Sequence, residues 1–557
     1  MTGPRVGLGG AKAQWTAIAA LSLVAAALRL WGVQWGMPSG DSLFSFHPDE
    51  GVNLANGVLD RGVVRPHLDI GFYNYGSFYF LIWQAAAAVN SAYGLVALGP
   101  ASGPTAPLAE TIASLTLVGR LISVAAGAAT VAVLALAVRS VWGLRAAVVA
   151  AALQAAAPLA TIHSRFATVD AAATLLTTTT LWAALRLIRS GITRSACTRT
   201  AALAGLLAGL AGATRYNAGM VVLAPLCAAI LRPSIMEEKG RTSAETHSDH
   251  PEADRRLKDR IWLASVVAAA SIVGFLAGCP GALLNWDKFT SDLLFEAHKS
   301  AEGMGLLFEG TGNGHVYHWV SSLRFALGWP LLLVSSLAAL QAMRRREPAD
   351  IVLLAFAVPY FAVMGLAKVR FMRYMLPLLP ALFAWVGRSI EEAQVSRRKR
   401  LGSVWSGAVA VSGMLGLCIS AAFSMTMAGP DARDTALRYI RGTLPPGATI
   451  AFATTPWYWS PPILPEFTAP VPGQVRRALL LKTPAAYVLR LPGENLEWDP
   501  TVLHDPPPDA VIISDLESQD AIRLKRPQAM GFLRRLESDF HVRAFGSRPR
   551  LFGMPMI

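Results

Sequence analysis

Charged residues are scarce in this chain. Asp, Glu, Lys and Arg make up 15% of its 557 residues, whereas a soluble protein carries about a quarter. Hydrophobic residues make up 53%, and they stand in long runs. The scarcity of charge excludes an ordinary soluble domain and is typical of a protein that crosses the membrane several times.

Cysteine is also scarce. The chain has four cysteines, none of them in the hydrophilic C-terminal tail and none in a Cys-x-x-Cys spacing: Cys197, Cys227, Cys279 and Cys418. A disulfide framework and a zinc site both need more cysteines, or closer ones, than this. We therefore expect neither.

The formal net charge of +14 would by itself suit a nucleic-acid partner. The Lys and Arg residues, however, lie mostly in short clusters between the apolar runs. This distribution follows the positive-inside rule, by which the cytoplasmic loops of membrane proteins are rich in Lys and Arg. We expect the lipid bilayer as a partner and no nucleic acid.

Twelve apolar runs are long enough to consider as membrane segments. The first, from about Trp15 to Gly36, has no Ala-x-Ala cleavage site and predicts an uncleaved transmembrane helix. The others lie at 78–98, 113–138, 146–162, 166–188, 200–213, 217–231, 261–279, 319–342, 350–367, 374–390 and 401–428.

Basic loops orient these segments. The amino terminus and the loops 139–145, 186–199, 344–350 and 391–400 are rich in Lys and Arg and should face the cytoplasm. Twelve crossings would contradict this pattern, because both termini would then share one side. The run 78–98 contains Gln84 and Asn90, so we expect it to dip into the membrane or lie at its surface.

The predicted fold is therefore an α-helical membrane domain over 1–430, of the plasma (inner) membrane, with eleven spans and one dipping helix. Within it we expect a flexible cytoplasmic loop at 232–260 and an external loop at 280–318. Hydropathy falls from about residue 430, and strand-like segments alternate with helix-like ones. That alternation predicts a small α/β domain over 431–557, outside the cytoplasm.

Ionisable residues gather at the outer membrane surface in this topology. Such groups are costly at membrane depth, so they tend to face a cavity or a partner. A site with carboxylates and fixed cations suits a substrate that presents a hydroxyl and a phosphate. The residues are Asp49, Glu50, His163, Arg165, Asp170, Arg215, Lys368, Arg370 and Arg373.

Each of these residues also has a plainer interpretation. Asp49 and Glu50 could form a solvated loop pair with His47 as a hydrogen-bonding neighbour, Arg165 could pair with Asp170, and Arg215 could reach the interface. The segment KVRFMRY, from Lys368 to Tyr374, could anchor a helix, although its predicted side contradicts the positive-inside rule. An aromatic cluster could be an interfacial belt or a sugar platform: Phe72, Tyr73, Tyr75, Phe78 and Tyr79.

The order of these motifs resembles that of GT-C fold glycosyltransferases of the family-39 type, which includes protein O-mannosyltransferases and the aminoarabinose transferase of lipid A. The matching motifs are HPDEG after the first helix, Arg165 and Asp170 in HSRFATVD, Arg215 in GATRYN, and RYMLPLLP from Arg373 to Pro380. The segment NYGSFYFLIW matches that family only loosely and lacks its lysine.

The resemblance implies a polyprenyl-phosphate sugar donor, a lipid, glycan or protein acceptor, and inversion of the anomeric centre on the extracytoplasmic face. It implies Asp49 as the catalytic base, with Glu50 positioning the acceptor or the base. Asp170 would contact a sugar. The candidate phosphate-binding residues are Arg165, Arg215, Arg370 and Arg373, and further candidate substrate-binding residues are His47, Tyr75, His163, Lys368 and Tyr374. No metal site is predicted, and a divalent cation at the acidic pair is left open.

Two other classes remain as alternatives. A transporter or flippase of a polyprenyl-linked or other lipid substrate would also need charge within the membrane, but no inverted repeat between the two halves is visible. A membrane-anchored binding protein that uses the external tail would leave Asp49 without a role.

Overall fold

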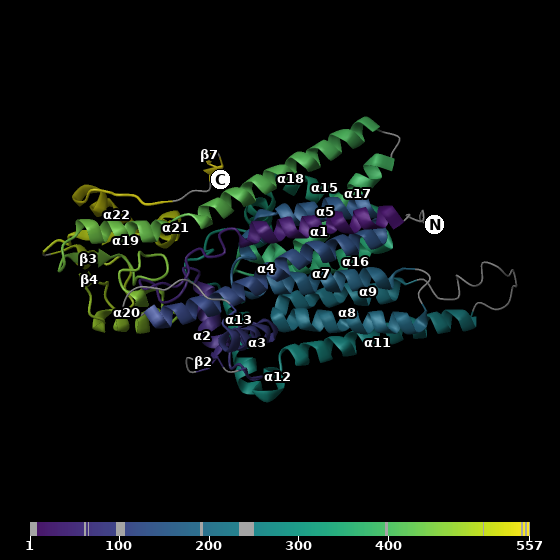
Figure 1. Cartoon of the computed structure of the whole chain (residues 1–557), viewed down its shortest axis with the longest axis horizontal. Coiled ribbons are helices and arrows are strands. Elements are labelled where there is room, and N and C mark those ends of the chain that lie inside the picture. The colour runs from purple at the N-terminus through teal and green to yellow at the C-terminus, as the bar shows by residue number, and fades with distance from the viewer. Residues whose placement is uncertain are drawn as a thin grey trace.

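The computed structural model describes residues 8–60, 63–64, 66–95, 106–189, 193–232, 250–395, 399–504, 506–546, 550–551 and 554–555. Long helices lie side by side through most of the molecule, and a small mixed domain of strands and helices stands beyond one end of them (Figure 1). The N-terminus lies toward the opposite end of the bundle.

The first half of the chain forms a helical layer. Its longer helices are α1 (Leu8–Leu30), α3 (Phe78–Tyr93), α4 (Ala106–Trp142), α5 (Leu144–Ala156), α7 (Val169–Leu187), α8 (Arg194–Thr214) and α11 (His250–Gly278). Shorter elements connect them: α2 (Pro48–Gly57), β1 (Leu59–Asp60), β2 (Val63–Val64), α6 (Pro158–His163), η1 (Tyr216–Val222) and α9 (Leu223–Leu231).

Helices α8 and α11 pack along each other more extensively than other helix pairs. A side chain at Gly205 or Gly209 would collide with backbone oxygens of α11, at 2.3 and 2.1 Å respectively. Small residues allow helices to approach closely in a membrane, where packing replaces the hydrophobic effect as the driving force.

The second half contributes α12 (Gly281–Leu284), α13 (Trp286–Glu302), α14 (Gly314–Tyr317), η3 (His318–Leu323), α15 (Arg324–Arg345), α16 (Pro348–Leu366), η4 (Met372–Leu378), α17 (Leu379–Val395) and α18 (Lys399–Ala428). Helix α17 packs against α5 and α15, and α18 packs against α15 and α17. These contacts join the two halves into one hydrophobic core.

Six helical stretches among the described residues are long and apolar enough to cross a membrane: Pro107–Trp142, Arg194–Thr214, Asp254–Gly278, Gly314–Arg345, Pro348–Leu366 and Gly402–Thr443. The prediction of a helical protein that spans the membrane several times is confirmed, and the count of eleven spans stays a prediction. Helix α3 has 16 residues, or about 24 Å, which is shorter than the hydrocarbon core of about 30 Å.

Two predicted loops contain helices. Residues 233–249 of the predicted loop 232–260 lie outside the described residues, but 250–260 form the start of α11, where Lys258 pairs with Asp254 at 2.6 Å. The predicted loop 280–318 holds α12, α13 and α14. The sequence of α13 looked like a loop because exposed charged residues, among them Asp287, Lys288 and Glu302, interrupt its hydrophobic pattern.

The C-terminal region contains a three-stranded parallel sheet in the order β4–β3–β5. Its strands are β3 (Thr449–Phe452), β4 (Val488–Arg490) and β5 (Ala510–Ile512), with α19 (Ala432–Thr443), η5 (Pro465–Thr468), α20 (Gly473–Lys482), η6 (Pro500–Leu503), α21 (Asp515–Arg523) and α22 (Pro527–Asp539). A small hairpin of β6 (Arg550–Leu551) and β7 (Met554–Pro555) follows. The predicted α/β architecture is present, while the domain boundary at residue 430 stays a prediction.

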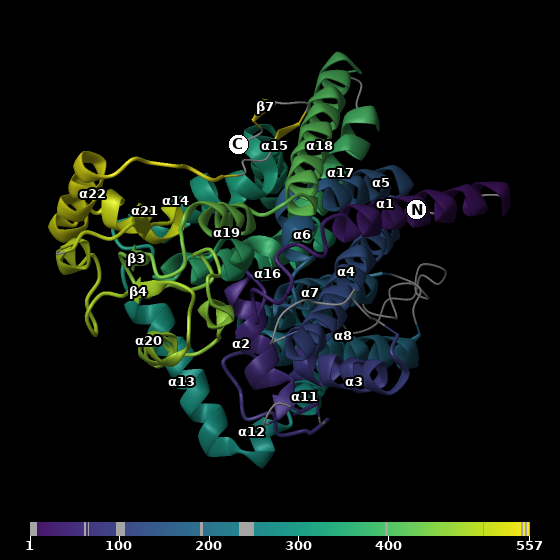
Figure 2. The same ribbon diagram turned by 60° about the vertical axis from the view of Figure 1, so that its left-hand side comes forward.

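The C-terminal region lies against the segment that leads into α2 (Figure 2). The backbone N–H of Phe44 donates to the Thr468 hydroxyl at 2.9 Å, and that of Leu43 donates to the Pro465 carbonyl at 3.3 Å. Arg441 pairs with Asp41 at 2.6 Å. The residues just before Asp49 are therefore held by both parts of the protein.

Candidate active site

Helix α2 sets Asp49 and Glu50 in different directions. Pro48 occupies its first turn after the N-cap residue His47, and the fixed φ angle of proline suits that position. Two carboxylates in the first turn are favoured by the partial positive charge of a helix N-terminus. Neighbouring residues on a helix point about 100° apart, so one side chain faces the interior and the other does not.

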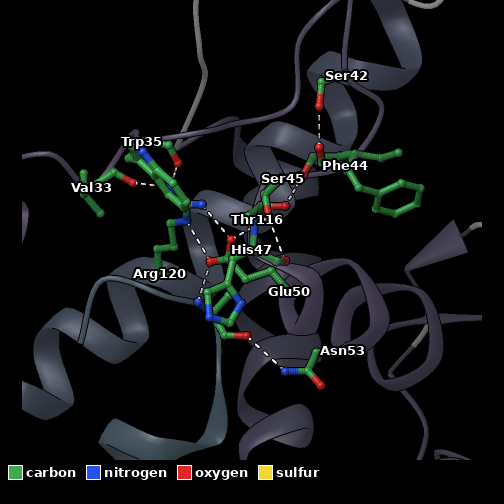
Figure 3. Close-up of polar contacts among 12 residues, drawn as sticks. Val33, Trp35, Ser42, Phe44, Ser45, His47, Glu50, Asn53, Thr116 and Arg120 are labelled. Carbon is green, nitrogen blue, oxygen red and sulfur yellow. Dashed lines mark hydrogen bonds and ion pairs between the residues drawn. The ribbon is translucent and has the colours of Figure 1, made fainter. Parts of the chain in front are cut away.

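Glu50 faces the interior and is almost fully buried. The guanidinium of Arg120 donates to both of its oxygens, with Nε at 2.8 Å from Oε1 and Nη2 at 2.6 Å from Oε2 (Figure 3). The Ser45 hydroxyl and the Ala167 N–H also donate to it, at 2.6 and 2.7 Å. Burial raises the pKa of Glu50, but Arg120, His47 and Ser45 together lower it, so the net pKa lies below its ordinary value.

Arg120 was not among the predicted site residues. It also donates to the carbonyls of Val33 and Trp35, at 2.6 and 2.7 Å, and thereby ties α4 to the segment after α1. A single arginine inside the apolar run 113–138 is the signal that could have identified it, because such a charge needs a buried partner.

Asp49 faces away from this pair and contacts Arg373 of η4, with 2.8 Å between Oδ2 and Nη2. The Asp49 side chain is 26% exposed. Arg373 Nε lies 3.9 Å from Oδ2 of Asp170, and Asp170 forms a close ion pair with Arg215. These four residues form the charged cluster of the site, and they come from α2, α7, the end of α8 and η4.

Aromatic residues hold the charged cluster in place. The Arg215 guanidinium lies over the Tyr374 ring, 4.6 Å from its centroid. The Arg373 side chain forms a hydrogen bond with the Tyr75 side chain. The Tyr216 hydroxyl donates to the Tyr75 carbonyl at 3.1 Å, and the Tyr360 hydroxyl donates to the Tyr374 carbonyl at 2.8 Å. The guanidinium groups are therefore set in position before a substrate arrives.

The charges around Asp49 keep it ionised. Burial raises the pKa of Asp49, but the positive charges of Arg373, His47, Lys299 and Arg215 together lower it below its ordinary value. Lys299 stands on α13 and pairs with Glu296 at 3.1 Å. It was missed because its segment was predicted to be a loop, with no face to direct it toward Asp49.

Two histidines flank the ring of Phe166 beside the charged cluster. The His47 ring lies 4.2 Å and the His163 ring 6.1 Å from it, measured between centroids. Burial lowers the pKa of His47 below its ordinary value, and the charges of Asp49 and Glu50 oppose that effect. The Nδ1 atoms of both histidines are buried without a hydrogen-bond partner among the described residues.

Three predicted site residues lie elsewhere. Arg165 is fully buried and donates to the Leu28 carbonyl at 2.5 Å and to the Ser424 hydroxyl, so it joins α1 to α18 instead of pairing with Asp170. Arg370 donates to the Thr311 hydroxyl and the Gly312 carbonyl, at 2.8 and 2.7 Å. Lys368 is exposed. The structure does not bring these three into the charged cluster.

A divalent cation does not fit the charged cluster. Both of its carboxylates, Asp49 and Asp170, face guanidinium groups, whereas a hard cation needs several oxygen ligands around it. Within the described ranges no group of three His, Cys, Asp or Glu side chains is placed to hold a metal ion. We therefore assign no chemistry to a metal.

Residues 109–242 match the family described as dolichyl-phosphate-mannose-protein mannosyltransferase. The matched segment covers less than half of the chain, and over that segment the chain is similar to this glycosyltransferase family. The matched segment runs from α4 into the residues after α9 and carries Arg120, His163, Asp170 and Arg215. This match agrees with the class predicted from the sequence, a membrane glycosyltransferase that uses a lipid-phosphate sugar. No curated protein sequence matches the chain.

Three solved structures are similar to this chain at low sequence identity. An oligosaccharyltransferase from Archaeoglobus fulgidus in the apo form has a TM-score of 0.46 and 13% identity, with 82% of this chain and 64% of that chain covered. ArnT from Cupriavidus metallidurans bound to undecaprenyl phosphate has a TM-score of 0.45 and 14% identity, with 80% and 83% covered. The protein O-mannosyltransferase Pmt1-Pmt2 of S. cerevisiae, bound to the sugar donor, has a TM-score of 0.34 and 14% identity, with 50% and 34% covered.

Proposed function

We propose that this protein transfers a sugar from a polyprenyl-phosphate donor to a hydroxyl of an acceptor at the extracytoplasmic membrane surface, with Asp49 as the base. The observation that carries the proposal is the contact between Asp49 and Arg373, at 2.8 Å. It sets a proton acceptor beside a cation that can bind the leaving phosphate. Asp170 and Arg215 extend the same cluster by a second carboxylate and a second guanidinium.

The acceptor hydroxyl attacks the anomeric carbon as the bond from that carbon to the phosphate oxygen breaks. The hydroxyl proton moves to Asp49, and the electron pair of the broken bond leaves with polyprenyl phosphate. Arg373 and Arg215 stabilise the negative charge that grows on the phosphate, because hydrogen bonds between charged groups are stronger than neutral ones. A single displacement of this kind inverts the anomeric centre.

Donor binding also prepares the base. Without a donor, Arg373 holds Asp49 in an ion pair and keeps its pKa low, which makes the carboxylate a poor proton acceptor. A phosphate on Arg373 would replace part of that attraction, and the pKa of Asp49 would rise toward the value that suits general base catalysis. Asp170, buried between the two arginines, keeps them in position during the exchange.

Glu50 supports this site from the interior. Its oxygens are engaged by Arg120, Ser45 and Ala167, so it does not face a substrate. Its role in the proposal is to fix the orientation of α2 and hence the direction of Asp49. Residues 1–430 would form the catalytic domain, and 431–557 an extracytoplasmic domain.

The experiment uses the purified full chain in lipid nanodiscs with a panel of polyprenyl-phosphate sugars and crude envelope acceptors. Release of polyprenyl phosphate together with a new glycosidic bond supports the proposal. A transporter or flippase of a lipid substrate is the alternative, and it would move the donor across a bilayer without breaking that bond. Movement without bond cleavage would therefore overturn the proposed reaction.

A further inference from the structure

Three consecutive aromatic residues follow the central strand of the C-terminal sheet: Trp457, Tyr458 and Trp459. We call them the aromatic segment. They come after the carboxyl end of β3, and ligands bind beyond the carboxyl ends of the strands in open α/β sheets. The rings contact one another, with centroids 4.8, 5.0 and 5.5 Å apart. Each of the three residues is half-buried, so part of its surface remains exposed.

The aromatic segment is held rigidly. The Arg476 guanidinium lies 4.5 Å from the centroid of Trp457 and donates to the Pro456 carbonyl at 2.9 Å. Arg433 donates to the Tyr458 carbonyl at 2.5 Å and pairs with Asp431 at 2.7 Å. A binding surface whose side chains are fixed beforehand loses little conformational entropy when a ligand arrives.

The same arginine joins the aromatic segment to the reaction site. Arg433 lies over the ring of Phe46, 3.9 Å from its centroid, and 5.3 Å from that of Trp35. Phe46 is separated from Asp49 only by His47 and Pro48. The C-terminal domain therefore brings its aromatic residues to the entrance of α2, beside the proposed base.

Tyr458 lies close enough to the charged cluster for the charges of Asp49 and Arg373 to affect the pKa of its hydroxyl. The pKa of Tyr458 is raised to about 12, mainly by burial and also by the charge of Asp49, while Arg433 and Arg373 oppose that effect. Beside it, Nε1 of Trp459 is a buried donor with no hydrogen-bond partner among the described residues. Such donors are nearly always paired in proteins, so a ligand oxygen would complete this one.

We propose that the aromatic segment is the acceptor subsite and that the acceptor is a carbohydrate. This inference rests on the proposed function. The flat aromatic faces match the C–H face of a pyranose ring, and the indole N–H and phenol O–H match its hydroxyl groups. An acceptor ring that stacks here presents a hydroxyl toward Asp49, whereas a serine or threonine side chain has no such face to stack.

The test measures binding and transfer in the full chain. The carbohydrate probes are methyl α-mannopyranoside, methyl α-glucopyranoside and methyl β-galactopyranoside. A serine-containing hexapeptide represents the alternative acceptor class, a protein. Saturation-transfer NMR on nanodisc samples reports binding. At least one glycoside should bind, and Tyr458→Ala and Trp459→Leu should each raise its Kd by at least about tenfold, as expected when a stacking contact is lost. Trp459→Phe keeps the ring and removes only the free N–H, so its effect should be smaller.

The matched control is Tyr439→Ala, because Tyr439 is an exposed aromatic residue of α19 in the same domain. It should bind the glycoside as the unaltered chain does. Thermal unfolding of each variant shows whether the domain remains folded. Donor binding should be unchanged in all three variants of the aromatic segment, which separates an acceptor subsite from a disturbed donor site.

The outcomes separate this inference from the proposed function. Binding of the hexapeptide in place of the glycosides, binding of neither, or glycoside binding that survives both Tyr458→Ala and Trp459→Leu would overturn the carbohydrate subsite. Full transfer by Asp49→Asn would instead overturn the proposed reaction, and glycoside binding, which needs no chemistry, would still report on the aromatic segment.

Discussion

Glu50 and Arg120 form a buried ion pair in which the guanidinium contacts both carboxylate oxygens, at 2.8 and 2.6 Å. The two residues are 70 positions apart in the chain. Their pair fixes α2 against α4 and leaves Asp49, the residue before Glu50, directed toward Arg373. The acidic pair of the sequence is thus divided between a structural role and a chemical one.

The first prediction concerns that division. Glu50→Gln removes the charge that balances Arg120 inside the protein, and breaking a buried pair in this way costs about 3–5 kcal/mol. We expect a clear fall in the thermal unfolding temperature in nanodiscs, along with lost activity. Glu302→Gln is the matched control, since Glu302 is an exposed carboxylate at the end of α13. Equal stability of Glu50→Gln and the unaltered chain would show that the pair does not hold α2.

The second prediction concerns the phosphate-binding cations. Arg215→Ala and Arg373→Ala each remove a charge-assisted hydrogen bond worth about 1.5–3 kcal/mol, and donor binding should weaken accordingly. Binding of a fluorescent polyprenyl-phosphate sugar measures it. Arg370→Ala is the control, because Arg370 contacts Thr311 and Gly312 outside the charged cluster. If the donor Kd is the same in all three variants, these arginines serve only the structure.

Much of the charged cluster could be anticipated because its members stand at helix ends. Alternating membrane crossings bring the ends of different helices to one surface, so topology alone groups Asp49, Asp170, Arg215 and Arg373. Topology does not give the direction of a side chain around a helix. Arg165 belongs to the same surface by position, yet it points between α1 and α18.

The contributions of α13 and of the C-terminal domain could not be anticipated. Lys299 reaches Asp49 only because α13 is a helix with one face toward the site. Tyr458 reaches it through contacts between residues some 400 positions apart, such as that of Arg441 with Asp41. Contacts of this range depend on how two folded parts dock, which local sequence patterns do not encode.

The third prediction concerns pH and the C-terminal domain. Burial raises the pKa of Glu517 to about 7, and this carboxyl accepts from the Thr454 hydroxyl and the Ser514 N–H. Because the folded pKa exceeds the unfolded value of about 4.3, the stabilising effect is complete below the unfolded value and is lost as pH rises through 7.

We therefore expect the domain to be more stable at pH 5 than at pH 8.5, by on the order of 1–2 kcal/mol. Hydrogen exchange of α21 in the full chain, corrected for the intrinsic effect of pH, measures the difference. Glu517→Gln imitates the protonated acid and should abolish it, while Glu537→Gln on the exposed side of α22 should not. A pH effect that persists in Glu517→Gln would assign it to another group.

The fourth prediction concerns sidedness. A variant with all four native cysteines replaced by alanine receives one new cysteine, either Arg400→Cys in the basic segment at the start of α18 or Gln528→Cys at an exposed position of α22. A membrane-impermeant maleimide should label Gln528→Cys in intact cells and Arg400→Cys only after permeabilisation, because basic loops remain in the cytoplasm. The reverse pattern would put Asp49 on the cytoplasmic side and rule out the proposed reaction at the outer surface.

The last prediction concerns Asp49 itself. A general base within hydrogen-bond reach contributes roughly 10²–10⁴-fold to rate. Asp49→Asn keeps the size of the side chain and removes the charge that accepts the proton. Arg373 loses one partner but retains Asp170, at 3.9 Å, and the Phe371 ring, at 4.2 Å, so the variant should fold and should bind donor at least as well as the unaltered chain. Transfer of sugar should nevertheless slow by at least about a hundredfold.

Single-turnover transfer with bound donor measures this step apart from binding, and Asp69→Asn, on the loop before α3, serves as a carboxylate control. Single-turnover rates that remain within about threefold of the unaltered chain would leave Asp49 as a structural partner of Arg373, since the loss expected for a general base is far larger.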